Sequence, residues 1–285
     1  MKSIFFLILI SLSYNNFSYE SLLLSYSTYD LLSGQSKYLI SKNISFNQKI
    51  KKNIASSLIV LPQDLTISSF NHTTNFLSDY SNFFSFNIVD YGEFKDSESQ
   101  STFYAKDIIL ENNIFKKINN SLHIGLGMKY LNSHIEDYAS SIITMNVHSY
   151  YQYHNILLST TIDNYGLIFD KYTNYTEQLP INYSLSLMYL PQYLHSSIAI
   201  HYNIFDYYDV INIFGELFIK DYSSITIGYT SLADNLYSDN FNNNFFTGFS
   251  IGYNLTYQDY IFNIGVKNFG ILGLIQTITI NKSVN

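Results

Sequence analysis

The segment Ser121-Leu-His-Ile-Gly-Leu-Gly-Met-Lys-Tyr130 places an apolar residue at every second position, with polar residues or glycine between. Ile181-Asn-Tyr-Ser-Leu-Ser-Leu-Met-Tyr189 follows the same alternation. Successive side chains of a β-strand point to opposite faces, so each segment has one apolar and one polar face. In a soluble sandwich the apolar face packs inward, whereas in an outer-membrane barrel it faces lipid and the polar face lines the lumen.

The composition favours the barrel. Charged residues make up 13% of the chain, against about 25% in an average globular domain. Tyrosine (28) and phenylalanine (22) are abundant and tryptophan is absent. Tyr and Phe suit the interfacial girdles of a barrel, and Asn and Ser suit a wet lumen. An AT-rich genome would favour the same residues, but compositional drift does not produce alternation.

The N-terminus has the pattern of a secretory signal. Lys2 is followed by the apolar run Ile4–Ile10, which is too short to span a membrane as a helix, and we expect a cleaved signal peptide over residues 1–18. Residues 19–53 break the alternation, and three roles fit them: a plug in the lumen, a lining of the periplasmic mouth, or a loosely ordered lead-in. The barrel is expected over residues 54–285.

The alternation predicts an all-β fold, a transmembrane antiparallel β-barrel of about fourteen strands, many of them near the ~9–11 residues needed to cross a bilayer at a tilt. The predicted strands are Ala55–Leu61, Leu65–Thr73, Tyr80–Asp90, Thr102–Asn112, Asn120–Leu131, Ala139–Tyr151, Tyr153–Asp163, Ile181–Leu190, Leu194–Phe205, Tyr208–Ile219, Tyr222–Thr230, Asn244–Leu255, Tyr260–Lys267 and Leu272–Asn281.

The gaps between these strands carry a second pattern. Those after the sixth, eighth, tenth and twelfth strands are short, while the long gaps follow odd-numbered strands: Tyr91–Ser101, Asn132–Tyr138, Asn164–Pro180 and Ser231–Asn243. The ninth gap, Asp206-Tyr207, is a short exception. Tight turns at one rim and longer loops at the other are typical of bacterial outer-membrane barrels.

Several stretches of the chain resemble a known family. They are Asp90-Tyr-Gly-Glu-Phe94 with Phe103-Tyr-Ala-Lys-Asp107, Leu122–Tyr130 with Ile135-Glu-Asp-Tyr-Ala-Ser-Ser141, Asp163-Asn-Tyr-Gly166 with Glu177-Gln-Leu-Pro180, and Gly248-Phe-Ser-Ile-Gly-Tyr253 with Asn268-Phe-Gly-Ile-Leu-Gly273. With them the chain resembles the PorQ/PorV outer-membrane proteins of the type IX secretion system, within the FadL-like barrel superfamily. The family usually carries Asn-Pro-Ala before the first strand, where this chain has Asn53-Ile54-Ala55, a candidate plug or first-strand motif.

Catalytic and metal-binding patterns are missing from the sequence. The chain has no cysteine, which excludes disulfides, thiolate nucleophiles and cysteine metal sites. No His-x-x-x-His with a Glu and no Gly-x-Ser-x-Gly elbow occurs. The formal net charge of −7, with no basic stripe, argues against nucleic acid as a partner. We therefore expect a protein that is not an enzyme and that needs no cofactor or metal.

Two groups of residues are candidates for function. The first group falls on the polar face of predicted strands and is expected to line the lumen, with a role as ligands or bases the weaker alternative: His123, Lys129, His148 and His201. The second lies in the gap Ser231–Asn243, where exposed aromatic residues could anchor a partner or belong to a solvated Asn-rich loop: Leu236, Tyr237 and Phe241.

Three functions fit these observations. The resemblance implies a barrel in the bacterial outer membrane that contacts lipid and docks type IX translocon components or cargo C-terminal domains through its outer loops. The alternative is a FadL-like transporter of long-chain fatty acids or other hydrophobic molecules, which would need an apolar pocket near the plug and a lateral opening in the wall. Leu157, Phe214 and Phe218 lean inward and hint at such a lumen. A surface sandwich, the third possibility, would be a soluble protein.

Overall fold

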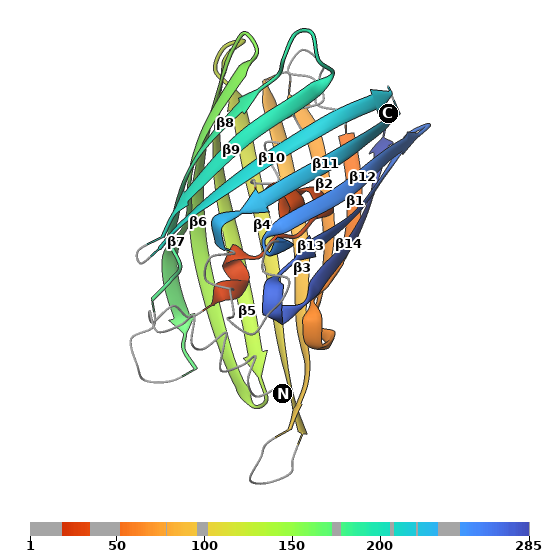
Figure 1. Ribbon diagram of the computed structural model, residues 1–285. Coiled ribbons are helices and arrows are strands. Elements are labelled where there is room, and N and C mark those ends of the chain that lie inside the picture. Colours follow the sequence, from red (N-terminus) through yellow and green to blue (C-terminus); the bar gives the residue numbers. More distant parts are fainter. Residues whose placement is uncertain are drawn as a thin grey trace.

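A computed structural model of the chain describes residues 19–34, 52–77, 79–95, 102–172, 178–205, 208–220, 222–232 and 246–284. Its strands form a closed antiparallel barrel in which each strand pairs with its neighbours in the sequence and β1 pairs with β14 (Figure 1). Closure leaves no strand edge exposed to lipid, as a membrane barrel requires. The predicted fold class and the fourteen strands are confirmed, and the soluble sandwich is excluded.

The strand bounds agree with the predicted ones to within a few residues at most ends. The strands are β1 (Lys52–Val60), β2 (Thr66–Leu77), β3 (Tyr80–Lys95), β4 (Thr102–Lys117), β5 (Leu122–Ile135), β6 (Tyr138–Tyr153), β7 (Ile156–Asp170), β8 (Asn182–Tyr189), β9 (Ser196–Ile204), β10 (Asp209–Lys220), β11 (Ser223–Thr230), β12 (Phe249–Tyr257), β13 (Tyr260–Asn268) and β14 (Leu274–Val284). Of the elements within the described residues, two are short 3-10 helices between strands, η2 (Pro62–Asp64) and η5 (Gly270–Leu272).

The outer surface of the barrel is apolar and its inner surface is mixed. In β5, Leu126 and Met128 are 64% and 53% exposed, whereas Lys129 between Met128 and Tyr130 is only 9% exposed. The same alternation of exposed apolar and buried residues runs through the other strands, for example β8 and β9. The exposed apolar side chains therefore form the surface that faces lipid, and the buried polar ones face the lumen.

The two rims of the barrel differ as the gaps predict. The connections after β2, β6, β10 and β12 are short, and Lys52 and Val284 pair at this same rim, which we call the turn rim. The opposite end is the loop rim. The prediction of a long loop over Asn132–Tyr138 is wrong. β5 continues to Ile135 and β6 begins at Tyr138, so the two strands are joined by the two-residue turn Glu136-Asp137.

β3 and β7 also extend beyond their predicted ends, to Lys95 and Asp170. In β7 the outward residues Tyr165, Leu167 and Phe169 remain apolar, but Gly166 and Ile168 occupy the inward positions, so the contrast between the two faces that identifies a strand is lost. Strands β3 to β7 contain 14 to 16 residues, and we call them the long-strand half. Strands β8 to β14 contain 8 to 12 residues and form the short-strand half. In Figure 1 the β3–β4 hairpin projects furthest at the loop rim.

The N-terminal residues 19–34, which we call the plug segment, lie inside the barrel (Figure 1). They form the 3-10 helix η1 (Glu20–Leu23) and the short helix α2 (Thr28–Ser33). The Ser27 side chain caps α2 by accepting a hydrogen bond from the Asp30 amide, and Gly34 ends the helix in a left-handed conformation with φ 63°. No helix in the described residues is long and apolar enough to cross a membrane.

Candidate functional site

The candidate site is the lumen around the plug segment. Its wall near the loop rim carries a row of inward aliphatic side chains, one from each of seven adjacent strands. Direct cross-strand pairs connect several of them, such as Ile59 with Ile67 and Leu131 with Ile142. The row, which we call the aliphatic row, consists of Ile275, Ile59, Ile67, Val89, Ile109, Leu131 and Ile142.

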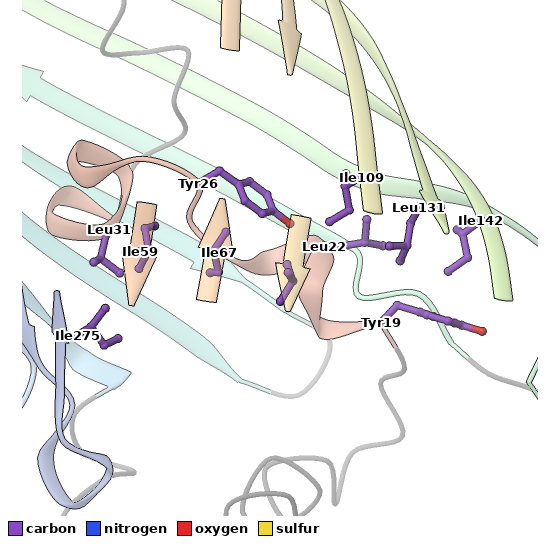
Figure 2. Close-up of a cluster of buried hydrophobic side chains, with 11 residues drawn as sticks. Tyr19, Leu22, Tyr26, Leu31, Ile59, Ile67, Ile109, Leu131, Ile142 and Ile275 are labelled. Carbon is purple, nitrogen blue, oxygen red and sulfur yellow. The ribbon is translucent and has the colours of Figure 1, made fainter. Parts of the chain in front are cut away.

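The plug segment covers the aliphatic row. Tyr19, Leu22, Tyr26 and Leu31 pack against it and are each less than a tenth exposed (Figure 2). The sequence signal for the row is a break in the alternation, where apolar residues occupy both faces, as in Ile108-Ile109-Leu110. The predicted strands contained these runs, but alternation alone gave no reason for a second apolar surface inside the barrel.

A second apolar patch lines the lumen on the other wall. Here Leu157, Met188, Ala199 and Phe214 follow one another across β7 to β10 as direct cross-strand partners. Tyr29 of α2 packs on Phe214, with ring centroids 5.0 Å apart. The expectation of inward Leu157 and Phe214 is met, since both are almost fully buried, whereas Phe218 is 39% exposed.

The short-strand half holds α2 by hydroxyl and amide contacts. Thr28 Oγ1 lies 2.8 Å from Thr277 Oγ1 and 2.9 Å from Thr279 Oγ1, and the Thr28 amide donates to Thr279 Oγ1 at 2.9 Å. Ser250 Oγ donates to the Leu32 carbonyl at 3.0 Å, and Lys267 Nζ donates to the Leu31 carbonyl at 3.3 Å. The bonds from Ser250 and Lys267 satisfy two carbonyls at the C-terminal end of α2.

Three inward glycines make room for Leu32. A Cβ added at Gly228 would lie 2.1 Å from the Leu32 carbonyl oxygen. Added at Gly252 or Gly265, it would lie 2.3 Å or 2.9 Å from the Leu32 Cδ1 atom. β11, β12 and β13 each contribute one of these glycines. This glycine cradle was missed at the sequence level, although the position of each glycine on the inner face of its strand could have indicated it.

The long-strand half holds the other end of the plug segment. Tyr19 OH is hydrogen-bonded to Ser140 Oγ at 2.7 Å, and the Tyr19 ring stacks on Tyr172 with centroids 5.9 Å apart and planes 20° apart. Tyr172 in turn donates its hydroxyl to Ser133. Tyr172 lies directly after β7, so the chain that leaves β7 holds Tyr19 at the start of the plug segment.

Of the predicted lumen residues, the structure places Lys129, His148 and His201 on the buried inner face and His123 in a partly buried position on β5. Lys129 and His148 belong to one network. Lys129 Nζ donates to Asn164 Oδ1 at 2.9 Å, and His148 Nε2 lies 3.2 Å from Asn113 Oδ1. His201 is elsewhere, with Ser186 as its hydrogen-bond partner.

Asn164 and Glu111 connect the hydrogen bonds of Lys129 with those of His148. Asn164 has φ 65° at a bulge in β7, where the residue pair Asp163 and Asn164 faces Asn146 on β6. Its amide donates to Asn146 Oδ1 at 3.1 Å, and its side chain donates to the Pro180 carbonyl at 3.1 Å. Glu111 Oε1 accepts from the Asn113 and Asn146 side chains at 3.2 and 3.3 Å. The bulge thus pins the chain before β8 to the lumen wall.

The remaining candidates are placed as follows. Asn53, Ile54 and Ala55 lie within β1 as ordinary strand residues, with Ile54 outward and Ala55 inward. The loop candidates Leu236, Tyr237 and Phe241 lie outside the described residues, as does the expected signal peptide. Within the described part of the chain, no group of three His, Cys, Asp or Glu side chains could hold a metal ion.

Two ionisable groups of the plug segment have shifted pKa values. Burial raises the pKa of the Glu20 carboxyl from 4.5 to about 7. Burial, and then the nearby carboxylates of Glu111 and Asp107, raise the pKa of Tyr26 well above its ordinary value. In the connection between β9 and β10, burial and the charge of Glu20 raise the pKa of Tyr208 to about 12. The charged forms of these groups are therefore disfavoured where they stand.

The described geometry defines a plugged outer-membrane-type barrel with apolar patches in its lumen. No family model and no curated protein match the chain. Among solved structures it is similar to the Pseudomonas putida toluene transporter TodX, with TM-score 0.56, 8% identity, and coverage of 94% of this chain and 95% of that one.

Two further solved structures are of the same kind. The CymD monoaromatic hydrocarbon channel has TM-score 0.60 at 7% identity, with coverage of 84% and 90% of the two chains. A Pseudomonas aeruginosa FadL homologue has TM-score 0.51 at 7% identity, with coverage of 82% and 89%. At these identities the likeness is one of fold, so the chain has the fold of the FadL-like outer-membrane barrels. This is the fold that the sequence resemblance implies, and membership of the PorQ/PorV family stays a prediction.

Proposed function

We propose that this protein is an outer-membrane channel for hydrophobic small molecules, gated by its plug segment. The observation that carries the proposal is the aliphatic row, because the lumen of a water-filled porin is polar. Seven adjacent strands each contribute an apolar side chain to a surface that faces away from lipid. The plug segment covers this surface in the structure, and once uncovered the surface offers a binding track to an apolar solute.

The wall near the bulge of β7 supports the same function. The ladder between β7 and β8 runs from Ile156–Tyr189 to Asp163–Asn182, whereas β7 stays paired with β6 as far as Asp170. Leu179, just before β8, packs instead against the cluster that contains the aliphatic row. A solute bound to the row would leave sideways into the bilayer at this point, where the regular ladder on one side of β7 stops.

The neighbours in fold support a transport function by analogy. TodX is described as a toluene transporter and CymD as a monoaromatic hydrocarbon channel. Their fold alone does not fix what this chain carries, since one fold hosts many functions. The aliphatic row and the plug segment are features of this chain itself, and they agree with that function.

Uptake into intact cells tests the proposal. The protein would be expressed in a bacterial host that lacks its own hydrophobic channels, and entry of a labelled alkylbenzene would be compared with entry of a labelled disaccharide. We expect faster entry of the alkylbenzene only. The control replaces Ile109 and Leu131 of the aliphatic row with serine, which should remove the gain; faster entry of the disaccharide instead would identify a porin and overturn the proposal.

A role in type IX secretion is the second candidate. It rests on the sequence resemblance, and one observation favours it: the projecting strands expose aromatic side chains near the loop rim, including Tyr104, Tyr138 and Phe169. Translocon components or cargo C-terminal domains would dock there. The exported proteome with and without the gene is the test, and retention of proteins that carry type IX C-terminal signals would support this role over transport.

A further inference from the structure

The inner face of β4 places two carboxylates beside the aliphatic row. Asp107 and Glu111 are each two residues from Ile109, so all three side chains point into the lumen. The exposed fractions of Asp107, Ile109 and Glu111 are 4%, 1% and 2%. Any molecule that rests on Ile109 therefore lies next to both carboxylates.

Neutral groups contact Asp107 within the described residues. Tyr91 OH donates to Asp107 Oδ2 at 2.9 Å, and Ser133 donates to Oδ1. The neighbouring basic side chains of Lys106 and His134 belong to the exposed outer face of their strands. Hydroxyl donors stabilise a carboxylate without cancelling its charge, so the field of Asp107 reaches the lumen.

Lys129 and Lys267, the lysines buried in the described part of the chain, do not offer a site for an anion. Lys129 is the cross-strand partner of Glu111, and its ammonium donates to Asn164 Oδ1 at 2.9 Å. Lys267 donates to the Leu31 carbonyl in the glycine cradle region. Lys129 offsets part of the charge of Glu111, whereas the hydroxyls of Tyr91 and Ser133 are bonded to Asp107 in the described part of the chain.

We propose that the aliphatic row selects uncharged hydrophobic molecules and rejects anionic amphiphiles such as fatty-acid carboxylates, with Asp107 and Glu111 as the discriminating residues. This rests on the proposed transport function and names its substrate class. An anionic head group brought to the row would meet carboxylates of like charge at buried positions, where repulsion is weakly screened. An alcohol of the same chain length carries no such penalty.

Photoaffinity labelling at pH 8 tests the proposal on the full-length protein in outer-membrane vesicles. Two probes of equal chain length carry the same diazirine, one ending in a hydroxyl and the other in a carboxylate. Mass spectrometry measures the label on peptides of β4 and β5. In the wild type we expect labelling by the alcohol to exceed labelling by the carboxylate by about tenfold, which corresponds to ~1.4 kcal/mol.

The variants separate charge from partitioning. Asp107→Asn and Glu111→Gln keep the size of the side chain and should each reduce the alcohol-to-carboxylate ratio, while Glu93→Gln, on the exposed part of β3, should leave it unchanged. Because every variant meets the same probes in the same lipid, differences in partitioning cancel in the comparison.

Three other results would overturn the proposal. If the carboxylate labels the row as well as the alcohol, the selectivity is wrong while hydrophobic transport stands. If Asp107→Asn and Glu111→Gln both leave the ratio at its wild-type value, these residues do not discriminate. If neither probe labels the row, the transport function fails and this inference fails with it.

Discussion

The long-strand and short-strand halves of the barrel hold the same plug segment in different ways. The short-strand half fits it by shape, through the glycine cradle around Leu32 and the threonine contacts of Thr28. The aliphatic row runs from β14 through β1 and β2 into β3 to β6 of the long-strand half and binds the segment by apolar contact, and Ser140 of β6 binds the hydroxyl of Tyr19. Shape fit resists displacement of one fixed conformation, whereas an apolar surface accepts any apolar occupant. The comparison indicates that the short-strand half fixes where α2 rests in the closed state, whereas the aliphatic row is the surface on which a solute replaces the plug segment.

The strand lengths suit this division. A strand needs ~9–11 residues to cross a bilayer, so the 16 residues of β3 and β4 leave about five residues, or about 15 Å of strand, beyond it. The long-strand half therefore reaches away from the membrane at the loop rim and presents Tyr172 to the plug segment. The short-strand half ends near the bilayer surface.

The largest effect is expected from locking α2 to the short-strand half. The chain has no cysteine, so Thr28→Cys with Thr279→Cys introduces a single disulfide where the two hydroxyl oxygens are 2.9 Å apart. If α2 has to leave its seat during transport, uptake of an alkylbenzene falls by about tenfold or more under oxidising conditions, because the open state is no longer populated. Addition of a reductant restores it.

The two single-cysteine variants serve as controls for this lock. They should transport at the wild-type rate with or without reductant. Full uptake by the oxidised double variant, with the disulfide verified by mass spectrometry, would contradict the movement of α2 and restrict any gating motion to η1.

The next effect concerns the glycine cradle. Gly228→Ala forces a Cβ against the Leu32 backbone carbonyl, and we expect α2 docking to weaken by ~1–3 kcal/mol, typical of overpacking. Hydrogen exchange of the Leu31 and Gly34 amides, both bonded within α2, measures the loss. Gly215→Ala is the matched control, since its Cβ would meet only the Ser197 carbonyl at 4.0 Å.

A second-site change sharpens this test. At Gly265 the three nearest atoms all belong to the Leu32 side chain, so Leu32→Ala should restore the docking lost in Gly265→Ala. At Gly228 the obstructed atom is backbone, and the same Leu32→Ala should restore nothing. Equal rescue at both positions would mean that the cradle does not act by shape.

In the long-strand half, the bulge at Asn164 is expected to have a moderate effect. Asn164→Ala removes the bonds to Lys129 and Pro180 and puts alanine at φ 65°, which we expect to lower the free energy of unfolding by ~2–3 kcal/mol. Asn164→Gly loses the same bonds without the backbone strain and should lose about 1 kcal/mol less. Urea unfolding in detergent micelles, followed by gel mobility, compares the two; equal losses would show that φ at this position carries no cost.

The smallest effect is a pH dependence at Glu20. Its pKa is about 7 with the plug segment docked, against 4.5 in water, so the docked state binds the proton more tightly. Docking is therefore strongest below about pH 4.5, weakens as the pH rises towards 7, and stays constant above. Hydrogen exchange of the Leu22 amide, corrected for intrinsic exchange, should follow this course, and Glu20→Gln should remove it. A wild-type profile that is flat between pH 4.5 and 7 would contradict the docked position of Glu20.

The local pattern of the sequence was enough to predict the wall. Alternation recognises a lipid-facing strand wherever one face is apolar and the other polar, and it located all fourteen strands, including β8 and β9 on either side of a short turn. It failed where that contrast ends. At the end of β5 the outward residues Asn132 and His134 and the inward Ser133 are all polar, so alternation predicts a loop where the strand continues. Around Ile109, apolar residues occupy both faces, so alternation does not reveal the inner apolar surface.

The class of fold thus follows from the order of residues along the chain, because the period of a strand and the thickness of a bilayer act on consecutive residues. The filling of the lumen depends on tertiary contacts. Leu32 meets Gly228, Gly252 and Gly265, and Tyr19 meets Ser140 and Tyr172, at separations that no local period encodes. These contacts depend on barrel closure, which brings the inner faces of all strands around a segment that precedes them in the chain.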